Sequence, residues 1–328
     1  MAAAKKKILI PGTIAPDAIE VLRKRDDVDA VVYEVTISTA EFHALLKDAQ
    51  GVALSMTPFG EAELKAAPQV RVVARIGVGF DAVDVPALTR HNIPLMVTGT
   101  ANSPTVAENA LFLMMALAKL GEHFDSMTKE NRWWDRMKRL PSDLYQKTVV
   151  VVGFGRIGTR TSRFCLALGM NVLVYDPYVR GAVIEGAGYT PVNDLDEALA
   201  LADFVSIHCP KNDETRGMFN AARLARLKPT AYLVNTARGG IIDEKALHAA
   251  LTGKKLAGAG LDVFEIEPVP ADNPLLKLPN VITAPHMAGV TKESVDRMGV
   301  TTVTNILDVL DGKPNLENVV NRDIYRHR

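Results

Sequence analysis

Three polar residues in the last third of the chain could carry out acid–base chemistry and bind an anion. Arg238, Glu267 and His286 each follow a short apolar run, in the segments Asn235–Gly240, Leu261–Pro268 and Ala284–Gly289. A guanidinium group binds carboxylate oxygens bidentately, and an imidazole exchanges protons near neutral pH. Ligands of open parallel sheets bind beyond the carboxyl ends of the strands, so we expect the three side chains to converge in one crevice.

A glycine motif follows an apolar run nearer the middle of the chain. The run Val149–Val152 leads into Gly153, Gly155 and Gly158, which form the pattern GxGxxG. In such a motif the first glycine permits a tight turn, the second lets the backbone approach a pyrophosphate, and the third lets a helix pack closely on the strand. The N-terminus of that helix offers free N–H groups to the phosphates. The pattern therefore predicts a dinucleotide site.

An acidic residue indicates which dinucleotide binds there. Asp176 ends the next apolar run, near the position, about 20 residues beyond the glycines, where a carboxylate accepts the ribose hydroxyls of NAD. The same carboxylate would repel the 2′-phosphate of NADP, and neither Pro177 nor Tyr178 offers a cation. Arg180 could weaken this preference. A glycine turn that only packs a helix on a sheet is the alternative, but the strand, the spacing and the acid together favour NAD.

Apolar runs alternate with helical patterns in two successive stretches of the chain, which is typical of βα repeats. We therefore predict an α/β protein with two doubly wound parallel-sheet domains, one of them a Rossmann domain inserted into a flavodoxin-like domain. We expect four strands in the first stretch and six in the second, at residues 7–10, 51–55, 70–76, 94–97, 148–152, 171–175, 204–207, 231–234, 257–261 and 281–283.

Two turn-like segments place the domain boundaries. Thr98–Pro104 is rich in Thr, Gly, Asn, Ser and Pro and ends in good start signals for a helix. Pro285–Gly289 precedes a helical pattern at Lys292–Leu310, which can return to the first domain. We expect a substrate domain at 1–99, completed by 290–328, and an NAD-binding domain at 100–289.

The composition argues against several classes of function. The chain has 38 Lys and Arg and 38 Asp and Glu, so no global field attracts a nucleic acid or an acidic membrane. Cys165 and Cys209 have no neighbours at zinc-ligand spacing, so we expect no metal site. Ile8–Ile10 is too short for the core of a signal peptide, and Lys119 interrupts the most apolar window. These features predict a cytoplasmic protein.

The whole pattern resembles the D-isomer specific 2-hydroxyacid dehydrogenase family, especially its phosphoglycerate dehydrogenase and hydroxypyruvate or glyoxylate reductase branches. The resemblance spans nearly the whole chain. Its motifs are the glycine motif, the three segments with Arg238, Glu267 and His286, and the segments Arg75–Asp81 and Thr100–Glu108.

The resemblance implies an NAD-dependent interconversion of a small 2-keto acid and its D-2-hydroxy acid. Arg238 would hold the substrate, and His286 would exchange a proton with its oxygen. Glu267 would orient the imidazole and stabilise its charged form. The backbone N–H groups of Val78 and Gly79 would bind the substrate carboxylate, because glycine lets the main chain come close.

The resemblance also implies which residues line the cofactor. Asp262 would hold the nicotinamide carboxamide. The full set of expected cofactor-binding residues is Gly153, Gly155, Arg156, Ile157, Gly158, Asp176, His208, Cys209, Pro210, Thr236, Ala237, Asp262 and Gly289.

The substrate and two other functions stay open. Leu54–Pro58 lacks the basic residues expected in members that use phosphoglycerate, so we expect glyoxylate or hydroxypyruvate first. Arg75 and the basic segment Arg132–Arg139 could still serve a phosphorylated substrate. A dinucleotide-sensing binding protein of the corepressor type and a phosphite dehydrogenase are the alternatives. Formate-using relatives carry glutamine where Glu267 stands and are disfavoured.

Several of these residues also have purely structural interpretations. His208 could pack in a loop as readily as contact a cofactor, and Glu267 could be a solvated loop acid. The apolar pattern Thr105–Leu120 fits the core or a subunit interface. The polar segment Gly121–Asp143, with Trp133 and Trp134, resembles an arm that grips a partner subunit, and the resemblance implies a homodimer.

Overall fold

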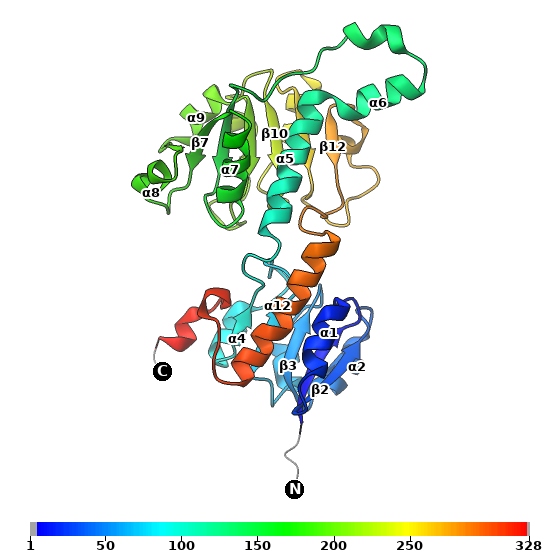
Figure 1. The fold of residues 1–328 in the computed structure, drawn as a ribbon, viewed down its shortest axis with the longest axis vertical. Coiled ribbons are helices and arrows are strands. Elements are labelled where there is room, and N and C mark those ends of the chain that lie inside the picture. Colours follow the sequence, from blue (N-terminus) through cyan, green and yellow to red (C-terminus); the bar gives the residue numbers. More distant parts are fainter. Residues whose placement is uncertain (1–4, 327–328) are drawn as a thin grey trace. The chain divides into compact units, whose positions relative to one another are not determined.

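The chain folds into two compact α/β units, which Figure 1 shows as ribbons. This computed structural model describes residues 5–326, so residues 1–4 and 327–328 of the expected first domain lie outside the described residues. The first unit comprises the chain up to Asn102 together with the segment from Val290 onward, and the second unit is Ser103–Gly289. Each unit has its own sheet and is described by itself.

The first unit contains a five-stranded parallel sheet with the strand order β2-β1-β3-β4-β5. This is the flavodoxin-like order, and it confirms the predicted fold of this unit. The strands are β1 (Lys6–Pro11), β2 (Val28–Tyr33), β3 (Ala49–Leu54), β4 (Val72–Arg75) and β5 (Leu95–Met96).

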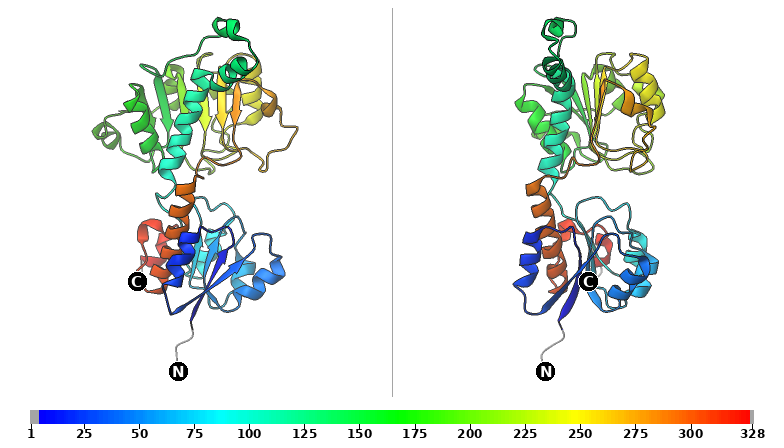
Figure 2. Two further views of the ribbon diagram at one scale, coloured as in Figure 1. Left: turned by 45° about the vertical axis from the view of Figure 1, so that its right-hand side comes forward. Right: turned by 90° about the vertical axis from the view of Figure 1, so that its right-hand side faces the viewer.

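Helices cover both faces of this sheet, as the edge-on view of Figure 2 shows. Alternate side chains of a strand point to opposite faces, so Ile8 and Ile10 pack on one side and Leu9 packs on the other. The first face is covered by α1 (Pro16–Arg23) and α12 (Lys292–Leu310), and the second by α2 (Thr39–Leu46), α3 (Glu61–Ala66) and α4 (Val85–Arg90). Two short 3₁₀ helices, Leu316–Asn318 and Arg322–Tyr325, follow α12.

The second unit contains a seven-stranded parallel sheet with the order β12-β11-β10-β9-β6-β7-β8. From β6 the chain adds β7 and β8 on one side of the sheet, and it then adds β9 to β12 on the other side. The boundary between β6 and β9 is therefore the switch point at which doubly wound folds bind ligands. The strands are β6 (Thr148–Val152), β7 (Asn171–Tyr175), β8 (Thr190–Pro191), β9 (Phe204–Ile207), β10 (Tyr232–Asn235), β11 (Gly258–Leu261) and β12 (Val281–Thr283).

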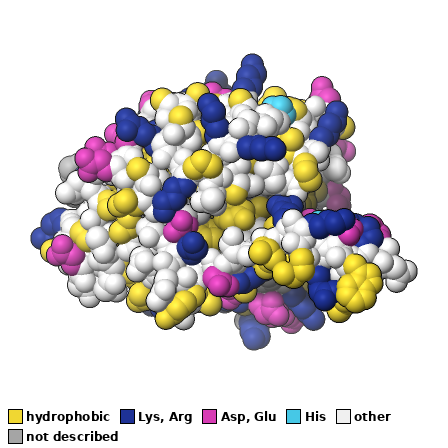
Figure 3. Space-filling view, turned by 90° about the horizontal axis from the view of Figure 1, so that it is seen from above, with side chains coloured by type: hydrophobic (Ala, Val, Ile, Leu, Met, Phe, Trp, Pro, Cys, Tyr) yellow, Lys and Arg dark blue, Asp and Glu magenta, His cyan; other side chains and the backbone are white. Residues whose placement is uncertain are grey.

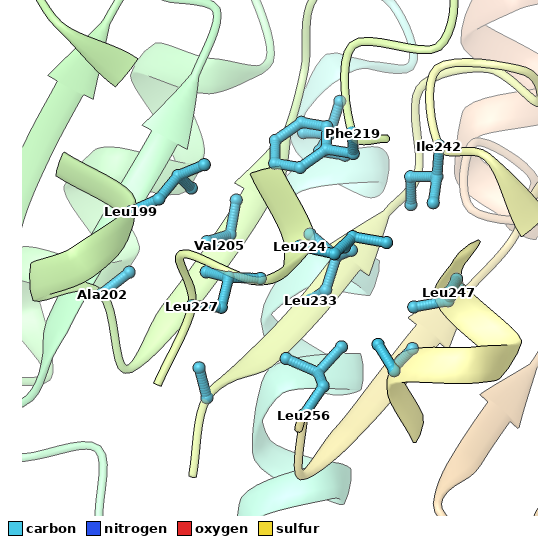
Figure 4. Close-up of a cluster of buried hydrophobic side chains, with 14 of the residues drawn as sticks. Leu199, Ala202, Val205, Phe219, Leu224, Leu227, Leu233, Ile242, Leu247 and Leu256 are labelled. Atoms are coloured by element: carbon cyan, nitrogen blue, oxygen red, sulfur yellow. The ribbon is translucent and has the colours of Figure 1, made fainter. Parts of the chain in front are cut away.

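Two hydrophobic cores sandwich this second sheet. Val149 and Val151 face α5 (Ser103–Lys119), α7 (Gly158–Ala167) and α8 (Gly181–Gly186). Val150 and Val152 face the opposite core, whose leucines, Val205 and Phe219 interdigitate in Figure 4. That core is built with α9 (Leu195–Leu201), α10 (Ala221–Leu224), α11 (Glu244–Thr252) and the 3₁₀ helix Pro274–Lys277.

Two strands were missed in the sequence. Val28–Tyr33 forms an edge strand with a largely exposed middle, so it lacks the continuous apolar run of the inner strands. Thr190–Pro191 adds a two-residue strand at the edge of the second sheet, so this sheet has seven strands where six were expected. Edge strands are exposed on one side and carry a weaker apolar signal.

The segment after α5 forms an arm of the second unit. It comprises α6 (Gly121–Lys129) and the 3₁₀ helix Trp133–Met137, and its C-terminal end is tied back by Ser142 N–H, which donates to Ala118. Trp134 is 84% exposed, and Arg136 lies 5.2 Å from the ring centroids of both tryptophans. Figure 3 shows exposed hydrophobic side chains interspersed with Lys and Arg on the face that it presents. None of the described helices is long and apolar enough to cross a membrane.

Candidate active site

His286 and Glu267 form a hydrogen-bonded pair in the second unit. The imidazole Nδ1 lies 2.7 Å from Glu267 Oε2. The other carboxylate oxygen, Oε1, accepts a hydrogen bond of 2.9 Å from the backbone N–H of Phe264, which fixes the carboxylate. His286 is 47% exposed and Glu267 34% exposed at their side chains, so Nε2 of the imidazole is left to face a ligand.

Asp262 anchors the loop that carries His286. One carboxylate oxygen of Asp262 accepts from Met287 N–H at 2.7 Å, and the other accepts from Ala288 N–H at 2.9 Å. Its carbonyl also accepts the N–H of His286, whose φ of 57° lies in the left-handed region. Burial raises the pKa of Asp262 above its usual range, while the two N–H donors act in the opposite direction. Asp262 therefore holds an unusual backbone turn in place.

Arg238 lies on a loop that Asn235 organises. The Asn235 side chain accepts from Ala237 N–H at 3.0 Å and donates to the carbonyl of Arg238 at 2.9 Å. The Arg238 guanidinium donates to the carbonyl of Ala237 at 2.7 Å. Sequence reasoning missed Asn235 as a positioning residue, although an asparagine at the end of a strand two residues before a turn is a signal for such a bond.

The Arg238 loop and the Glu267 loop touch through a glycine that sequence reasoning also missed. A Cβ added to Gly239 would lie 1.6 Å from the carbonyl oxygen of Phe264 and 2.8 Å from the N of Glu265. Only glycine allows this approach, and the pair Gly239–Gly240 in the sequence was the available signal. The second unit thus brings Arg238, Glu267 and His286 to neighbouring loops at the carboxyl end of β10, β11 and β12.

The glycine motif forms a tight turn between β6 and α7. Gly153 has a φ of 98°, and a Cβ there would lie 2.7 Å from the N of Cys209 on the loop after β9. A Cβ on Gly158 would lie 1.9 Å from the carbonyl of Gly153, so the helix packs directly on the turn. A Cβ on Gly155 would meet nothing within 4 Å, so the backbone at this glycine faces open space.

Asp176 joins this turn to the loop after β7. Its carboxylate accepts from Phe154 N–H at 2.8 Å and from Tyr178 N–H at 2.9 Å. The side chain is therefore held beside the open backbone at Gly155, next to the switch point of the sheet. This is the position in which a carboxylate meets the ribose of a dinucleotide.

Eight buried side-chain polar atoms lack hydrogen-bond partners among the described residues, and two of them lie on the loops that follow β9 and β10. These two are Oγ1 of Thr236 and Nδ1 of His208. Nε2 of His208 lies 2.8 Å from Ser206 Oγ, and burial lowers the pKa of His208 to about 3, so the imidazole is neutral. Since buried polar groups are nearly always hydrogen-bonded, these atoms, the open Gly155 and the placement of Asp176 fit a bound dinucleotide.

The remaining residues expected at the cofactor lie on several loops of the second unit. Ile157 directly precedes α7, and the carbonyl of Arg156 accepts from Arg160 at 2.6 Å. The carbonyl of Pro210 accepts from Thr215 Oγ1 at 2.6 Å, and burial raises the pKa of Cys209 to about 11. The Cys209 thiol is therefore neutral and does not repel a negatively charged phosphate. Gly289 is the last residue of the second unit.

Val78 and Gly79 belong to the first unit, in the loop between β4 and α4. Gly77 precedes them with a φ of 113°, which an L side chain rarely adopts. Its carbonyl accepts a hydrogen bond of 3.0 Å from Thr98 N–H. The described residues contain no group of three or more His, Cys, Asp or Glu that could hold a metal ion.

Comparisons with known proteins show the family to which this chain belongs. Residues 111–288 match the family described as the D-isomer specific 2-hydroxyacid dehydrogenase, NAD binding domain. The chain belongs to the D-isomer specific 2-hydroxyacid dehydrogenase family. The matched residues include the glycine motif, Asp176, Arg238, Glu267 and His286, so the second unit holds the NAD-binding domain of this family.

Relatives of two named activities match almost the whole chain. A glyoxylate reductase of Korarchaeum cryptofilum is 36% identical and aligns over 99% of this chain and 98% of its own length. A D-3-phosphoglycerate dehydrogenase of Synechocystis is 37% identical over 94% of this chain. The chain spans only 55% of that protein, so it covers little more than half the length of such relatives.

A solved structure has the same fold. The D-lactate dehydrogenase of Aquifex aeolicus, complexed with NAD and lactic acid, superposes with a TM-score of 0.83 at 29% identity. The match covers 96% of this chain and 99% of that one. It confirms the predicted arrangement of two doubly wound parallel sheets.

Proposed function

We propose that the protein is an NAD-dependent D-2-hydroxyacid dehydrogenase that interconverts a small 2-keto acid and its D-2-hydroxy acid. The observation that carries this proposal is the Glu267–His286 pair, held at 2.7 Å beside the loop of Arg238. The first unit would serve as the substrate domain and the second as the NAD-binding domain. The named relatives and the NAD complex of the lactate dehydrogenase support this assignment.

His286 is the proton donor in the direction of reduction. Because Glu267 occupies Nδ1, the proton goes from Nε2 to the keto oxygen of the substrate, and the carboxylate stabilises the positive charge while the imidazole is protonated. Arg238 holds the substrate carboxylate and keto oxygen with its planar guanidinium. The N–H groups of Val78 and Gly79 bind the carboxylate.

NAD, when bound, supplies or accepts the hydride at its nicotinamide ring. Asp176 holds the ribose hydroxyls, and the open backbone at Gly155 receives the pyrophosphate. The unpartnered Thr236 hydroxyl and His208 Nδ1 contact the cofactor, which satisfies their hydrogen bonds. Asp262 already uses both carboxylate oxygens to hold Met287 and Ala288, so its first role is to position His286.

Glyoxylate or hydroxypyruvate is the proposed substrate. The glyoxylate reductase that matches this chain over nearly its full length supports this choice. Arg75, which could serve a phosphorylated substrate, already donates to the carbonyl of Ile76 at 2.5 Å and to the thioether of Met56 at 3.3 Å. Part of the hydrogen-bonding capacity of its guanidinium is therefore used within the first unit.

We also propose that the protein is a cytoplasmic homodimer. Its second unit carries a cluster of exposed large side chains on the arm, comprising Trp133, Trp134, Met137 and Leu140. Aromatic side chains and Met are enriched in interface cores, so the arm is suited to pack on a second copy of the chain. Sedimentation of the purified protein over a range of concentrations tests this state.

A substrate screen tests the proposed activity. Oxidation of NADH is measured with glyoxylate, hydroxypyruvate, pyruvate and phosphohydroxypyruvate, and we expect turnover with the first two to exceed turnover with phosphohydroxypyruvate. A His286→Ala variant is the control, since it removes the proton donor. Binding of NADH with no oxidation on any 2-keto acid would contradict the enzyme proposal and favour a dinucleotide-sensing protein.

A further inference from the structure

The C-terminal segment of the first unit closes the free edge of its sheet at β5. Val320 N–H donates to the carbonyl of Leu95 at 2.9 Å, and Val97 N–H donates to the carbonyl of Asn318 at 2.8 Å. Met96 and Val319 form an antiparallel bridge between these bonds. The segment 318–320 is therefore hydrogen-bonded to the strand that leads into Thr98.

One buried asparagine binds the peptide that follows β5, and a second buried asparagine donates to the side chain of the first. The Asn305 side chain, on α12, donates to the carbonyl of Val97 at 3.0 Å and accepts from the side chain of Asn318 at 2.9 Å. Asn305 is 2% exposed and Asn318 is 8% exposed. Burying two amides is costly unless their hydrogen bonds are made, so these bonds fix the orientation of the Asn305 amide.

The fixed peptide leads to the loop proposed to bind substrate. The carbonyl of Val97 and the N–H of Thr98 belong to one planar trans peptide, so holding the carbonyl aims the N–H. That N–H donates to the carbonyl of Gly77 at 3.0 Å. The carbonyl of Gly77 shares a second peptide unit with the N–H of Val78, which has no hydrogen-bond acceptor among the described residues.

We propose that Asn305 and Asn318 are positioning residues for the substrate carboxylate. They act on the N–H of Val78 through two peptide units in series, and this role rests on the proposed function. Every bond in the series points the same way, from the Asn318 amide to Val78, so each bond polarises the next and strengthens the last donor. The residues themselves touch no substrate.

Asn321 provides a matched control in the same segment. It is also buried, and its side chain accepts from Leu95 N–H at 2.9 Å and donates to the carbonyl of Ile93 at 2.9 Å. These bonds hold the same edge of the sheet but do not involve the peptide between Val97 and Thr98. A variant at this position disturbs packing and stability without altering the series of bonds.

The experiment compares Asn305→Ala, Asn318→Ala and Asn321→Ala in the full chain. Steady-state kinetics give KM for glyoxylate, KM for NADH and kcat, and hydrogen–deuterium exchange reports the amides of residues 76–80. Thermal melting shows how far each variant is destabilised. We expect Asn305→Ala to raise KM for glyoxylate about tenfold, with KM for NADH unchanged, and to speed exchange in the loop.

Asn318→Ala keeps the bond from Asn305 to Val97, so it should raise KM for glyoxylate and speed exchange in the loop by less than Asn305→Ala does. If Asn305→Ala does not fold, Asn318→Ala serves as the test. Asn321→Ala should lower the melting temperature and leave KM for glyoxylate and the exchange of the loop as in the wild type. Equal effects of the Asn305 and Asn321 variants, or no effect of the Asn305 and Asn318 variants, would overturn the proposal. If the wild type turns over no 2-keto acid, the proposed function fails, and the exchange data alone decide the positioning role.

Discussion

Gly239 and Phe264 are in backbone contact, with the carbonyl oxygen of Phe264 only 1.6 Å from where a Cβ of Gly239 would lie. The N–H of the same Phe264 donates to the carboxylate of Glu267. One short segment is therefore packed against the loop of Arg238 and bonded to the partner of His286. Arg238, which we propose to bind substrate, and the proposed acid–base pair of Glu267 and His286 are thus held by one shared segment.

A Gly239→Ala variant should disturb this shared segment without removing any functional side chain. The new methyl group would overlap the carbonyl of Phe264, so one of the two loops must shift. Displacements of about 1 Å can cost about 100-fold in rate, so we expect kcat/KM to fall by one to two orders of magnitude. Gly240→Ala is a poor control because of its φ of 79°, whereas Gly186→Ala, with nothing within 4 Å, should keep wild-type activity. Wild-type kinetics in Gly239→Ala would refute the coupling.

Removal of His286, the proposed proton donor, gives a more direct test of the proposed function. His286→Ala should lower turnover by about 10² to 10⁴, the usual contribution of general acid–base catalysis, while NADH still binds. Glu267→Gln keeps a hydrogen-bonding side chain at 2.7 Å but removes the charge that stabilises the imidazolium, so its loss should be smaller. Rapid kinetics with NADH fluorescence separate binding from turnover. An unchanged turnover in His286→Ala would mean that another group supplies the proton.

Arg238→Lys tests whether the planar guanidinium of Arg238 binds the substrate, as we propose. Lys keeps the positive charge but loses the planar pair of donors, so KM for the 2-keto acid should rise about tenfold or more and kcat should fall. The dissociation constant of NADH should stay the same, because the proposed role of Arg238 concerns the substrate. A kinetic profile equal to that of the wild type would remove Arg238 from the site.

The larger features of the fold could be predicted because they follow from runs and spacings in the sequence. Buried inner strands such as Thr148–Val152 are continuous apolar runs, and Lys292–Leu310 has the spacing and the length of one helix. The glycine motif predicted the tight turn between β6 and α7, which lies at the switch point of the second sheet. Edge strands such as Val28–Tyr33 were not predicted, because their exposed residues interrupt the apolar run.

The contacts that position the site could not be predicted, because they join segments far apart in the chain. Nothing in the sequence around Asp262 shows that its carboxylate meets Met287 and Ala288. The approach of Gly239 to Phe264 likewise depends on how two neighbouring loops pack. Sequence motifs indicate which side chains are candidates for the site, whereas tertiary packing sets the distances and orientations of those side chains.

Asp176→Ala tests the choice of dinucleotide. Without the carboxylate, the repulsion of a 2′-phosphate disappears and the hydrogen bonds to the ribose hydroxyls are lost, so the preference for NADH over NADPH should narrow. The tie from Asp176 to Phe154 and Tyr178 is also lost, so Asp176→Asn is a useful companion that keeps an acceptor. Dissociation constants for NADH and NADPH measure the ratio. An unaltered ratio in both variants would place the discriminating group elsewhere.

His208 should make the stability of the protein depend on pH in a defined window. Its pKa falls from an ordinary value of 6.5 to about 3 in the folded chain, because burial disfavours the charged imidazole. Below pH 6.5 the unfolded chain therefore binds a proton that the native chain does not, and the free energy of unfolding decreases as pH falls toward 3. The expected slope is about 1.4 kcal/mol per pH unit.

A His208→Gln variant isolates this contribution, since glutamine does not titrate. Urea unfolding at about pH 7 and about pH 5 should show that the wild type loses about 2 kcal/mol more stability than the variant over this interval. Carboxylates titrate in both proteins, so their effect cancels in the difference. Parallel pH dependences would show that the imidazole takes up a proton as readily in the folded chain as in the unfolded chain, which would contradict the neutral His208 that we propose to contact the cofactor.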